Sequence, residues 1–557
     1  MIKRLPLYLF LAAFTIRLLY LCQFAQSPFF HPARGLDPSL YQTWALSILK
    51  EGWLGKEVFK AMPLYPYLLA VFYALSGENL FLVYLFQLSL GSLNCLLTYR
   101  LGRQLEGDSL GLLAAFFLVF SGISIFYEAM LVPTFVISFL LLSTLLVVSK
   151  ANNLSRWTLG GVLWGLAALA HAGVLLWSPF VLAWGVWNDA QKAFSRKVLL
   201  LGSCFLAVFL ILGASMLRNL LVAREPVLLT AHGGVNFFIG NNPKATGQFQ
   251  SHFSKYTSAE QLFQQSKKEA EREMGHALTD GESSRFWFQK GLEFIRKDPA
   301  AFLRLLWRKW SFFWNAYEIP DVEDFYFFRK EFPVLQWAPF QSAILCPLAL
   351  LGILLSLRHP RRFFLVYGVL YSMIGGFLLF FVNSRYRACL LPILALFAAY
   401  GSLRLFEFLQ KRRPRALLIS LFLLFHLTLW TQVESFSEER GIGHYNTGIV
   451  YTQAGRFKEA IAEFYQALVT TKDEGMVQFA LGNAYFGQGS YEEAVDSFQA
   501  ALQQHPDFTD AYFNLGVSYA KLNRKPEARE ALRQALRLDP KAPDIQRKLE
   551  ELDGKMK

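Results

Sequence analysis

Two carboxylates lie beside apolar segments of this chain, where a charged side chain is costly unless it is paired or functional. Asp37 follows the first apolar segment in the stretch GLDPSLY, and Glu128 lies in the short turn SIFYEAML between two later apolar segments. A carboxylate within hydrogen-bond reach of a hydroxyl can remove its proton as that oxygen attacks a carbon atom. We therefore predict Asp37 and Glu128 as catalytic residues. The alternatives are that Asp37 caps the helix beginning at Pro38 and that Glu128 is a solvated turn residue.

Basic side chains near the ends of other apolar segments are candidates for binding a phosphate group. A guanidinium binds phosphate through two parallel hydrogen bonds, so Arg218, Arg385 and Arg387 are predicted to bind a lipid phosphate. His171 and Lys244 are further candidates. The alternatives are that Arg385 and Arg387 extend toward lipid headgroups and that His171 is a hydrogen-bonded structural residue.

Two neutral residues complete the predicted site. Tyr41 lies one helical turn after Asp37, and Asn241 lies in the loop GNNPKATG; both are assigned to the substrate pocket. This loop has the glycine, asparagine and proline of turn chemistry, but it lacks the GK[ST] ending of a nucleotide-binding loop.

The elements that must position these residues are membrane helices. The 557 residues are 54% hydrophobic, 16% aromatic and 17% charged, which is too apolar for soluble domains. A helical span needs about 17 to 25 apolar residues. Eleven candidate spans are 6–24, 79–99, 110–126, 129–149, 157–171, 173–188, 198–217, 336–357, 363–382, 388–409 and 416–432.

The distribution of charge predicts the topology. The chain has 55 basic and 42 acidic residues, a net charge of +13, but residues 438–557 alone hold 15 basic and 18 acidic residues. Six short loops between alternate spans contain sixteen basic residues: Lys3, Arg4, Arg100, Arg103, Lys150, Arg156, Lys192, Arg196, Lys197, Arg358, Arg361, Arg362, Lys411, Arg412, Arg413 and Arg415. Their only acids are Glu106, Asp108 and Asp189. The positive-inside rule places these loops and the N-terminus in the cytoplasm, and eleven crossings place the C-terminus outside. The positive charge therefore does not indicate a nucleic-acid partner.

The chain divides into two predicted domains. Residues 1–435 form the membrane module, with large outer segments at 25–77 and 218–335 and an interfacial apolar stretch at 62–76. Residues 438–557 form the second domain, in which Gly448, Gly482 and Gly516 recur every 34 residues with tyrosine and alanine in phase. This period predicts tetratricopeptide repeats at 441–474, 475–508 and 509–542. Such an array offers a concave surface to a peptide or protein, and the alternative is a structural or oligomerisation module.

Several stretches of residues 1–430 together resemble polyprenyl-phosphate-sugar-dependent transferases of the protein O-mannosyltransferase and ArnT-like group. These stretches are the loop with Asp37 and PLYP, Arg218-Asn219 before GGVNFFIGNNPKATG, FFWNAYEIPD, and RYR before LLP. The order of a transferase followed by repeats is similar to that of transmembrane and tetratricopeptide O-mannosyltransferases. The resemblance implies an all-α polytopic membrane protein with the type C glycosyltransferase fold, about 11 transmembrane helices and a C-terminal α-solenoid.

The resemblance also implies a reaction. A sugar carried on a polyprenyl phosphate passes to an acceptor on the outer face with inversion of configuration, and Asp37 matches the acidic residue that serves as base. Relatives carry two adjacent acids where this chain has Asp37-Pro38, so Glu128 is the candidate second acid. Relatives also carry a basic residue where this chain has the sequence Ala-His-Ala around His171. If a divalent cation is used, Asp37 and Glu128 are the oxygen ligands to test first, but two carboxylates are not enough to predict a metal or any other cofactor.

The predicted partners are a polyprenyl-phosphate-linked sugar, membrane lipid, and an acceptor protein or glycan recruited by the repeats. The predicted location is the inner (cytoplasmic) membrane, with the repeats in the periplasm or its extracytoplasmic equivalent. Two other functions compete: a membrane-anchored tetratricopeptide scaffold for assembly, and a polysaccharide polymerase or ligase. The scaffold does not explain ten of the spans, because one would suffice as an anchor.

Overall fold

The computed structural model describes residues 4–34, 36–187, 193–249, 259–321, 323–432, 437–470 and 474–552. The regular secondary structure of these residues is helical, and their one β-type contact is an isolated bridge between Ser121 and Pro339. The fold is therefore the all-α membrane and repeat architecture that the sequence predicts. The topogenic residues Lys3, Asp189 and Lys192 lie outside the described residues.

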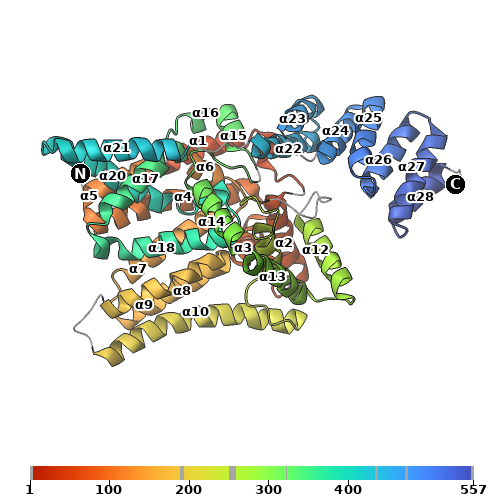
Figure 1. The fold of residues 1–557 in the computed structure, drawn as a ribbon. Coiled ribbons are helices and arrows are strands. Elements are labelled where there is room, and N and C mark those ends of the chain that lie inside the picture. Colours follow the sequence, from red (N-terminus) through yellow and green to blue (C-terminus); the bar gives the residue numbers. More distant parts are fainter. Residues whose placement is uncertain are drawn as a thin grey trace.

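Apolar helices form the bundle at one end of the molecule (Figure 1). Among the described residues, five helices are long and apolar enough to span a membrane: α1 (Leu5–Phe24), α4 (Leu80–Glu106), α10 (Phe194–Ala223), α18 (Pro360–Leu379) and α20 (Leu391–Gln410). Shorter helices complete the bundle: α5 (Asp108–Val119), α7 (Thr134–Val148), α8 (Leu154–Ala170), η3 (Ala172–Trp177) with α9 (Ser178–Trp187), α17 (Ser342–Ser356) and α21 (Pro414–Trp430). Each of the eleven predicted spans overlaps a helix, while the number of crossings stays a prediction.

The third predicted span, 110–126, is interrupted. Helix α5 ends at Val119, and α6 (Gly122–Glu128) begins after Ser121, whose side chain caps it by accepting the Ser124 N–H at 3.4 Å. A backbone group that the helix leaves unpaired at the break is paired with a distant segment, because Phe340 N–H donates to the Phe120 carbonyl at 3.2 Å. Backbone pairing of this kind permits a helix break within a membrane protein.

The two segments predicted to lie outside the membrane fold into short helices between the bundle and the repeats (Figure 1). Residues 25–79 contain η2 (Pro28–Phe30), α2 (Asp37–Glu51) and α3 (Leu64–Ser76), so the stretch predicted to be interfacial is a helix. Residues 224–341 contain α11 (Gly233–Gly240), α12 (Ala259–Met274), α13 (Asp280–Lys297), α14 (Pro299–Trp314), α15 (Phe325–Glu331) and α16 (Pro333–Gln336). A short helix, α19 (Ser384–Ala388), joins α18 to α20 on the same side.

The C-terminal helices are paired as the 34-residue period predicts. They are α22 (Ser437–Gln453), α23 (Phe457–Thr470), α24 (Glu474–Gln488), α25 (Tyr491–Gln504), α26 (Thr509–Lys521), α27 (Lys525–Leu538) and the final α28 (Pro543–Leu552). A Cβ at Gly448 would lie 2.5 Å from the Phe464 ring, and one at Gly482 would lie 2.7 Å from the Phe498 ring. Glycine therefore permits each helix pair to approach closely around an aromatic ring. The predicted domain limits near 435 and 438 stay a prediction.

Candidate active site

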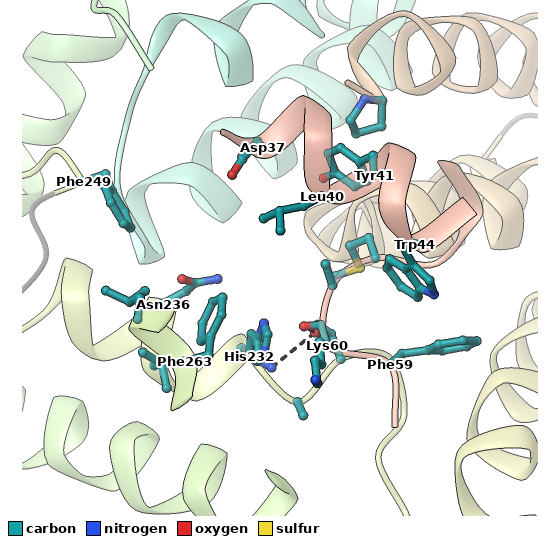
Figure 2. Close-up of a pocket in the computed structure, with 18 of the residues that line it drawn as sticks. Asp37, Leu40, Tyr41, Trp44, Phe59, Lys60, His232, Asn236, Phe249 and Phe263 are labelled. Carbon is teal, nitrogen blue, oxygen red and sulfur yellow. Dashed lines mark hydrogen bonds between the residues drawn. The ribbon is translucent and has the colours of Figure 1, made fainter. Parts of the chain in front are cut away.

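A cavity of about 1620 Å³ lies where the two segments predicted to be outside the membrane meet the first two repeats. Figure 2 shows Asp37, Leu40 and Tyr41 of α2 on one wall, and His232, Asn236 and Phe263 on the opposite wall. Two backbone hydrogen bonds join the walls: Ala231 N–H donates to the Phe59 carbonyl at 2.8 Å, and His232 N–H to the Lys60 carbonyl at 3.3 Å. The two segments thus line one continuous cavity.

Asp37 faces this cavity and is the first residue of α2, where Pro38 is compatible with helix initiation. The N-cap position is occupied by Leu36, so Asp37 is not the cap that the alternative predicted. Instead Asp37 Oδ2 accepts a hydrogen bond from Arg385 Nη1 at 2.7 Å, and 33% of the side chain remains exposed. The carboxylate is therefore oriented by a guanidinium and still reachable from the cavity.

Asp321 is a second carboxylate at this site, and it is not among the site residues predicted from the sequence. Its Oδ2 lies 2.9 Å from Arg385 Nε, and its Oδ1 accepts from Asn383 Nδ2 at 2.7 Å. Burial, together with the nearby charge of Asp37, raises the pKa of Asp321 to about 6 against the opposing effects of Arg385 and Asn383. The signal for it was present in the sequence as the end of the EIPD stretch.

Arg385 therefore joins two acids from different segments. It lines the cavity, but its donors face Asp37 and Asp321 rather than an open phosphate position. These carboxylates hold the pKa of Arg385 well above its usual value despite the opposing effect of burial. The sequence predicted a phosphate ligand here, and the observed geometry indicates a residue that positions the two carboxylates.

Tyr41, Arg218 and His171 also line the cavity. Burial raises the pKa of the Tyr41 hydroxyl above its usual value, which already leaves a tyrosine protonated and able to donate a hydrogen bond at neutral pH. Arg218 donates to the carbonyls of Leu54 and Glu57, and its guanidinium lies 4.0 Å from the centre of the Phe59 ring. His171 Nδ1 accepts the N–H of Gly173 at 3.1 Å, so this imidazole is also held by the backbone.

Two charged residues predicted for the site are buried elsewhere, each in an ion pair. Glu128 Oε2 lies 2.6 Å from Arg17 Nε, both side chains are inaccessible, and Ser124 donates to Glu128 Oε1 at 2.6 Å. Arg387 Nη2 lies 2.6 Å from Glu318 Oε2, and both of these side chains are also buried. Neither predicted residue lines the cavity. The prediction of a solvated turn for Glu128 is wrong as well, because helix packing brings Arg17 to it.

Asn241 and Lys244 also lie away from the cavity lining. Asn241 is fully buried, donates to the Phe237 and Leu379 carbonyls, and accepts from Lys309 Nζ at 3.1 Å. Its amide joins the outer segment to the end of α18. Lys244 is exposed at a turn that is held by its backbone hydrogen bond to Asn242.

Asp37 and Glu128, the oxygen ligands to test first if a divalent cation is used, do not come together in the structure. Glu128 is saturated by Arg17 and Ser124, whereas Asp37 is paired with Arg385, so the two carboxylates share no common position. The pair that does converge, Asp37 and Asp321, has the Arg385 guanidinium between its oxygens. Among the described residues no group of three histidine, cysteine or acidic side chains gathers to hold a metal.

Comparison with known families finds matches in two parts of the chain. Residues 60–215 match the family described as dolichyl-phosphate-mannose-protein mannosyltransferase. Residues 479–543 match a tetratricopeptide repeat family. The chain is a glycosyltransferase-like membrane protein with tetratricopeptide repeats. No curated protein sequence matches it.

The chain is similar to two solved structures of oligosaccharyltransferases from Archaeoglobus fulgidus. The AglB complex with an inhibitory peptide and a dolichol-phosphate is 15% identical with a TM-score of 0.39, and 83% of this chain is covered. The apo form is 13% identical with a TM-score of 0.40, and 86% of this chain is covered. In each case the match spans 60% of the length of the archaeal chain.

Proposed function

We propose that this protein transfers a sugar from a polyprenyl-phosphate donor to an acceptor hydroxyl on the extracytoplasmic face of the membrane, with inversion. The observation that carries the proposal is the Asp37–Arg385–Asp321 cluster, which holds one partly exposed carboxylate in a large cavity beside the apolar bundle. The match of residues 60–215 to a family named for dolichyl-phosphate-mannose supports the donor class.

In the proposed reaction Asp37 acts as the general base. The acceptor oxygen attacks the anomeric carbon, its proton passes to the Asp37 carboxylate, and the bond from that carbon to the phosphate oxygen breaks. The bonding electrons leave with the polyprenyl phosphate, and attack opposite the leaving group inverts the anomeric centre. Arg385 holds Asp37 in one orientation before substrate arrives, which lowers the entropy lost in reaching the reactive geometry.

The leaving phosphate gains negative charge and needs a cation near it. Arg218 is the best candidate, because it lines the cavity and, in the described part of the chain, has no carboxylate within ion-pair distance. Its contacts with the carbonyls of Leu54 and Glu57 fix the guanidinium at the cavity wall. Arg385 and Arg387 are already committed to acids.

The proposed orientation follows from the basic loops. With the N-terminus in the cytoplasm, the segments that carry Asp37, Asp321 and Arg385 fall on the opposite side together with the repeats. In a bacterium this places the reaction at the periplasmic face of the inner membrane. The repeats then recruit a protein acceptor or partner on the same side.

The test is sugar transfer by Asp37→Asn in isolated membranes supplied with radiolabelled dolichyl-phosphate mannose and other polyprenyl-phosphate sugars. The variant is expected to insert at the wild-type level and to lose transfer by about a hundredfold or more, as expected for loss of a positioned base. Glu78→Gln, an exposed carboxylate outside the cavity, is the matched control and is expected to retain full transfer. Undiminished transfer by Asp37→Asn would remove this carboxylate from the mechanism.

A further inference from the structure

The first two repeats form part of the wall of the proposed catalytic cavity. Ile442, Tyr445 and Asn446 of α22 and Met476 of α24 line the same cavity as Asp37. Gln504 and His505, at the end of α25, line it as well. The first helices of tetratricopeptide units line the concave side of such arrays. The concave surface of the repeats therefore begins inside the cavity and is continuous with the site that holds the catalytic carboxylate.

Direct contacts fix the first repeat against the segment that carries Asp37. The Gln453 side chain accepts the Arg34 N–H at 2.8 Å and donates to the Arg34 carbonyl at 3.1 Å, only three positions before Asp37. The Tyr451 ring packs against Phe29 and Phe327 with centroid distances of 5.4 and 6.2 Å. The distance from α22 to Asp37 is therefore set by packing and by two hydrogen bonds.

The size and chemistry of this combined space indicate its occupant. Ligand pockets are usually about 300–1,000 Å³, so a cavity of about 1620 Å³ has room for more than a sugar and its phosphate. The wall contributed by the repeats mixes apolar side chains, such as Ile442 and Met476, with the amides of Asn446 and Gln504. The Gln504 amide is already bonded to Gly475 N–H and to Glu474, so the apolar positions are the part of this wall that suits an extended polypeptide, because they accept its alternate side chains.

We infer that the acceptor is an extended polypeptide segment, and that the first repeat sets which of its hydroxyl side chains reaches Asp37. This inference rests on the proposed function. Residues of the acceptor bind along α22 and α24, and a strand advances about 3.3 Å per residue. Because the repeat is fixed relative to Asp37, the modified hydroxyl lies at a constant number of residues from the repeat-bound contacts.

The first test is binding, which needs no donor. The purified full chain in lipid nanodiscs is mixed with a pool of serine- and threonine-containing 25-residue peptides, and the retained peptides are identified by mass spectrometry. Ile442→Glu places a charge on the cavity wall, whereas Val469→Glu places the same charge on α23, where Val469 is 79% exposed and outside the cavity lining. Ile442→Glu is expected to reduce peptide retention about tenfold, and Val469→Glu to leave it unchanged. Equal retention by the two variants, or no peptide retained by the wild type, would overturn the inference.

The second test is transfer to three acceptors from the same donor: the peptide pool, a small-molecule alcohol and an oligosaccharide. Ile442→Glu is expected to lose transfer to peptides while keeping transfer to the small alcohol, and Asp37→Asn is expected to lose both. Loss of transfer to the oligosaccharide alone would replace the polypeptide with a glycan and overturn the inference. If Asp37→Asn keeps all transfer, the proposed function fails, whereas the binding result still stands or falls by itself.

The register can be read separately in the variant Tyr451→Ala with Gln453→Ala, which removes both sets of contacts. Peptides modified by the wild type are expected to carry sugar at one fixed position relative to their shared binding residues. The double variant is expected to modify the same peptides at scattered positions. A single fixed position in both proteins would contradict a register set by the first repeat.

Discussion

Replacement of Arg387 by alanine separates a structural role for this residue from the phosphate-binding role predicted from the sequence. Arg387 donates to the carbonyls of Phe313, Asn315 and Tyr317 at 2.9, 2.6 and 3.1 Å, and its guanidinium pairs with Glu318 at 2.6 Å. Only 2% of its side chain is exposed. Loss of one partner of a buried ion pair costs about 3–5 kcal/mol, because the other charge stays buried without compensation. This is a large fraction of a typical unfolding free energy of about 5–15 kcal/mol.

The assay is thermal and denaturant unfolding of the detergent-solubilised protein, followed alongside its yield in membranes. Arg387→Ala is expected to unfold well before the wild type, and Arg304→Ala, an exposed arginine of α14, to match the wild type. Arg387→Met combined with Glu318→Leu removes both charges and is expected to recover the part of the loss that comes from the unpaired Glu318 carboxylate. Arg387→Ala and the double variant both still lose the hydrogen bonds that Arg387 donates to the three carbonyls.

The opposite result is equally clear. If Arg387→Ala unfolds like the wild type and instead raises the KM for the polyprenyl-phosphate donor, then Arg387 contacts the phosphate and the structural reasoning is refuted. The double variant adds a second check, because a phosphate ligand could not be replaced by methionine without the same loss of donor binding.

Four further perturbations test other parts of the structure. Glu128→Gln leaves Arg17 buried beside a neutral amide, so the free energy of unfolding is expected to fall by about 3–5 kcal/mol while sugar transfer per folded molecule is retained. Loss of transfer without loss of stability would restore Glu128 to the mechanism. Burial raises the pKa of Asp321 to about 6, so its protonation below that pH weakens its pairing with Arg385. The rate of sugar transfer is therefore expected to rise with pH through about 6. Asp321→Asn is expected to lose this step in the pH–rate profile. Burial lowers the pKa of Lys309 from 10.5 to about 7. Between pH 7 and 10.5 the unfolded chain therefore binds more protons than the folded chain, so the free energy of unfolding is expected to rise with pH across that window. Lys309→Met is expected to flatten this rise in melting curves measured at a series of pH values. Gly482→Val forces a side chain into the Phe498 ring and is expected to destabilise the repeats by about 1–3 kcal/mol in calorimetry, and an unchanged transition would show that the helix pair has room to adjust.

The membrane helices and the repeats were predictable from the sequence because both depend on local patterns. An apolar run long enough to span hydrocarbon must be helical to satisfy its own backbone groups. The repeat signal needs only the phase of residues such as Gly448 and Phe464, which recurs at Gly482 and Phe498. Helix limits were less secure where a distant segment intervenes, as at Ser121, which meets Pro339.

The carboxylate at Asp37 was also identified from the sequence, since its type and its place after the first span are local facts. The partner of each charged side chain could not be identified from the sequence. Asp37 and Arg385 are separated by 348 positions, and Arg17 and Glu128 by 111. An acid at the end of a span can be a base, a cap or half of a buried pair, and only the packing of helices from distant parts of the chain brings one particular partner within reach. The sequence thus determined the helices, the period and a short set of candidate acids and bases. The tertiary structure decided that Arg385 pairs with Asp37, that Asp321 joins them, and that Glu128 and Arg387 lie in buried ion pairs away from the cavity.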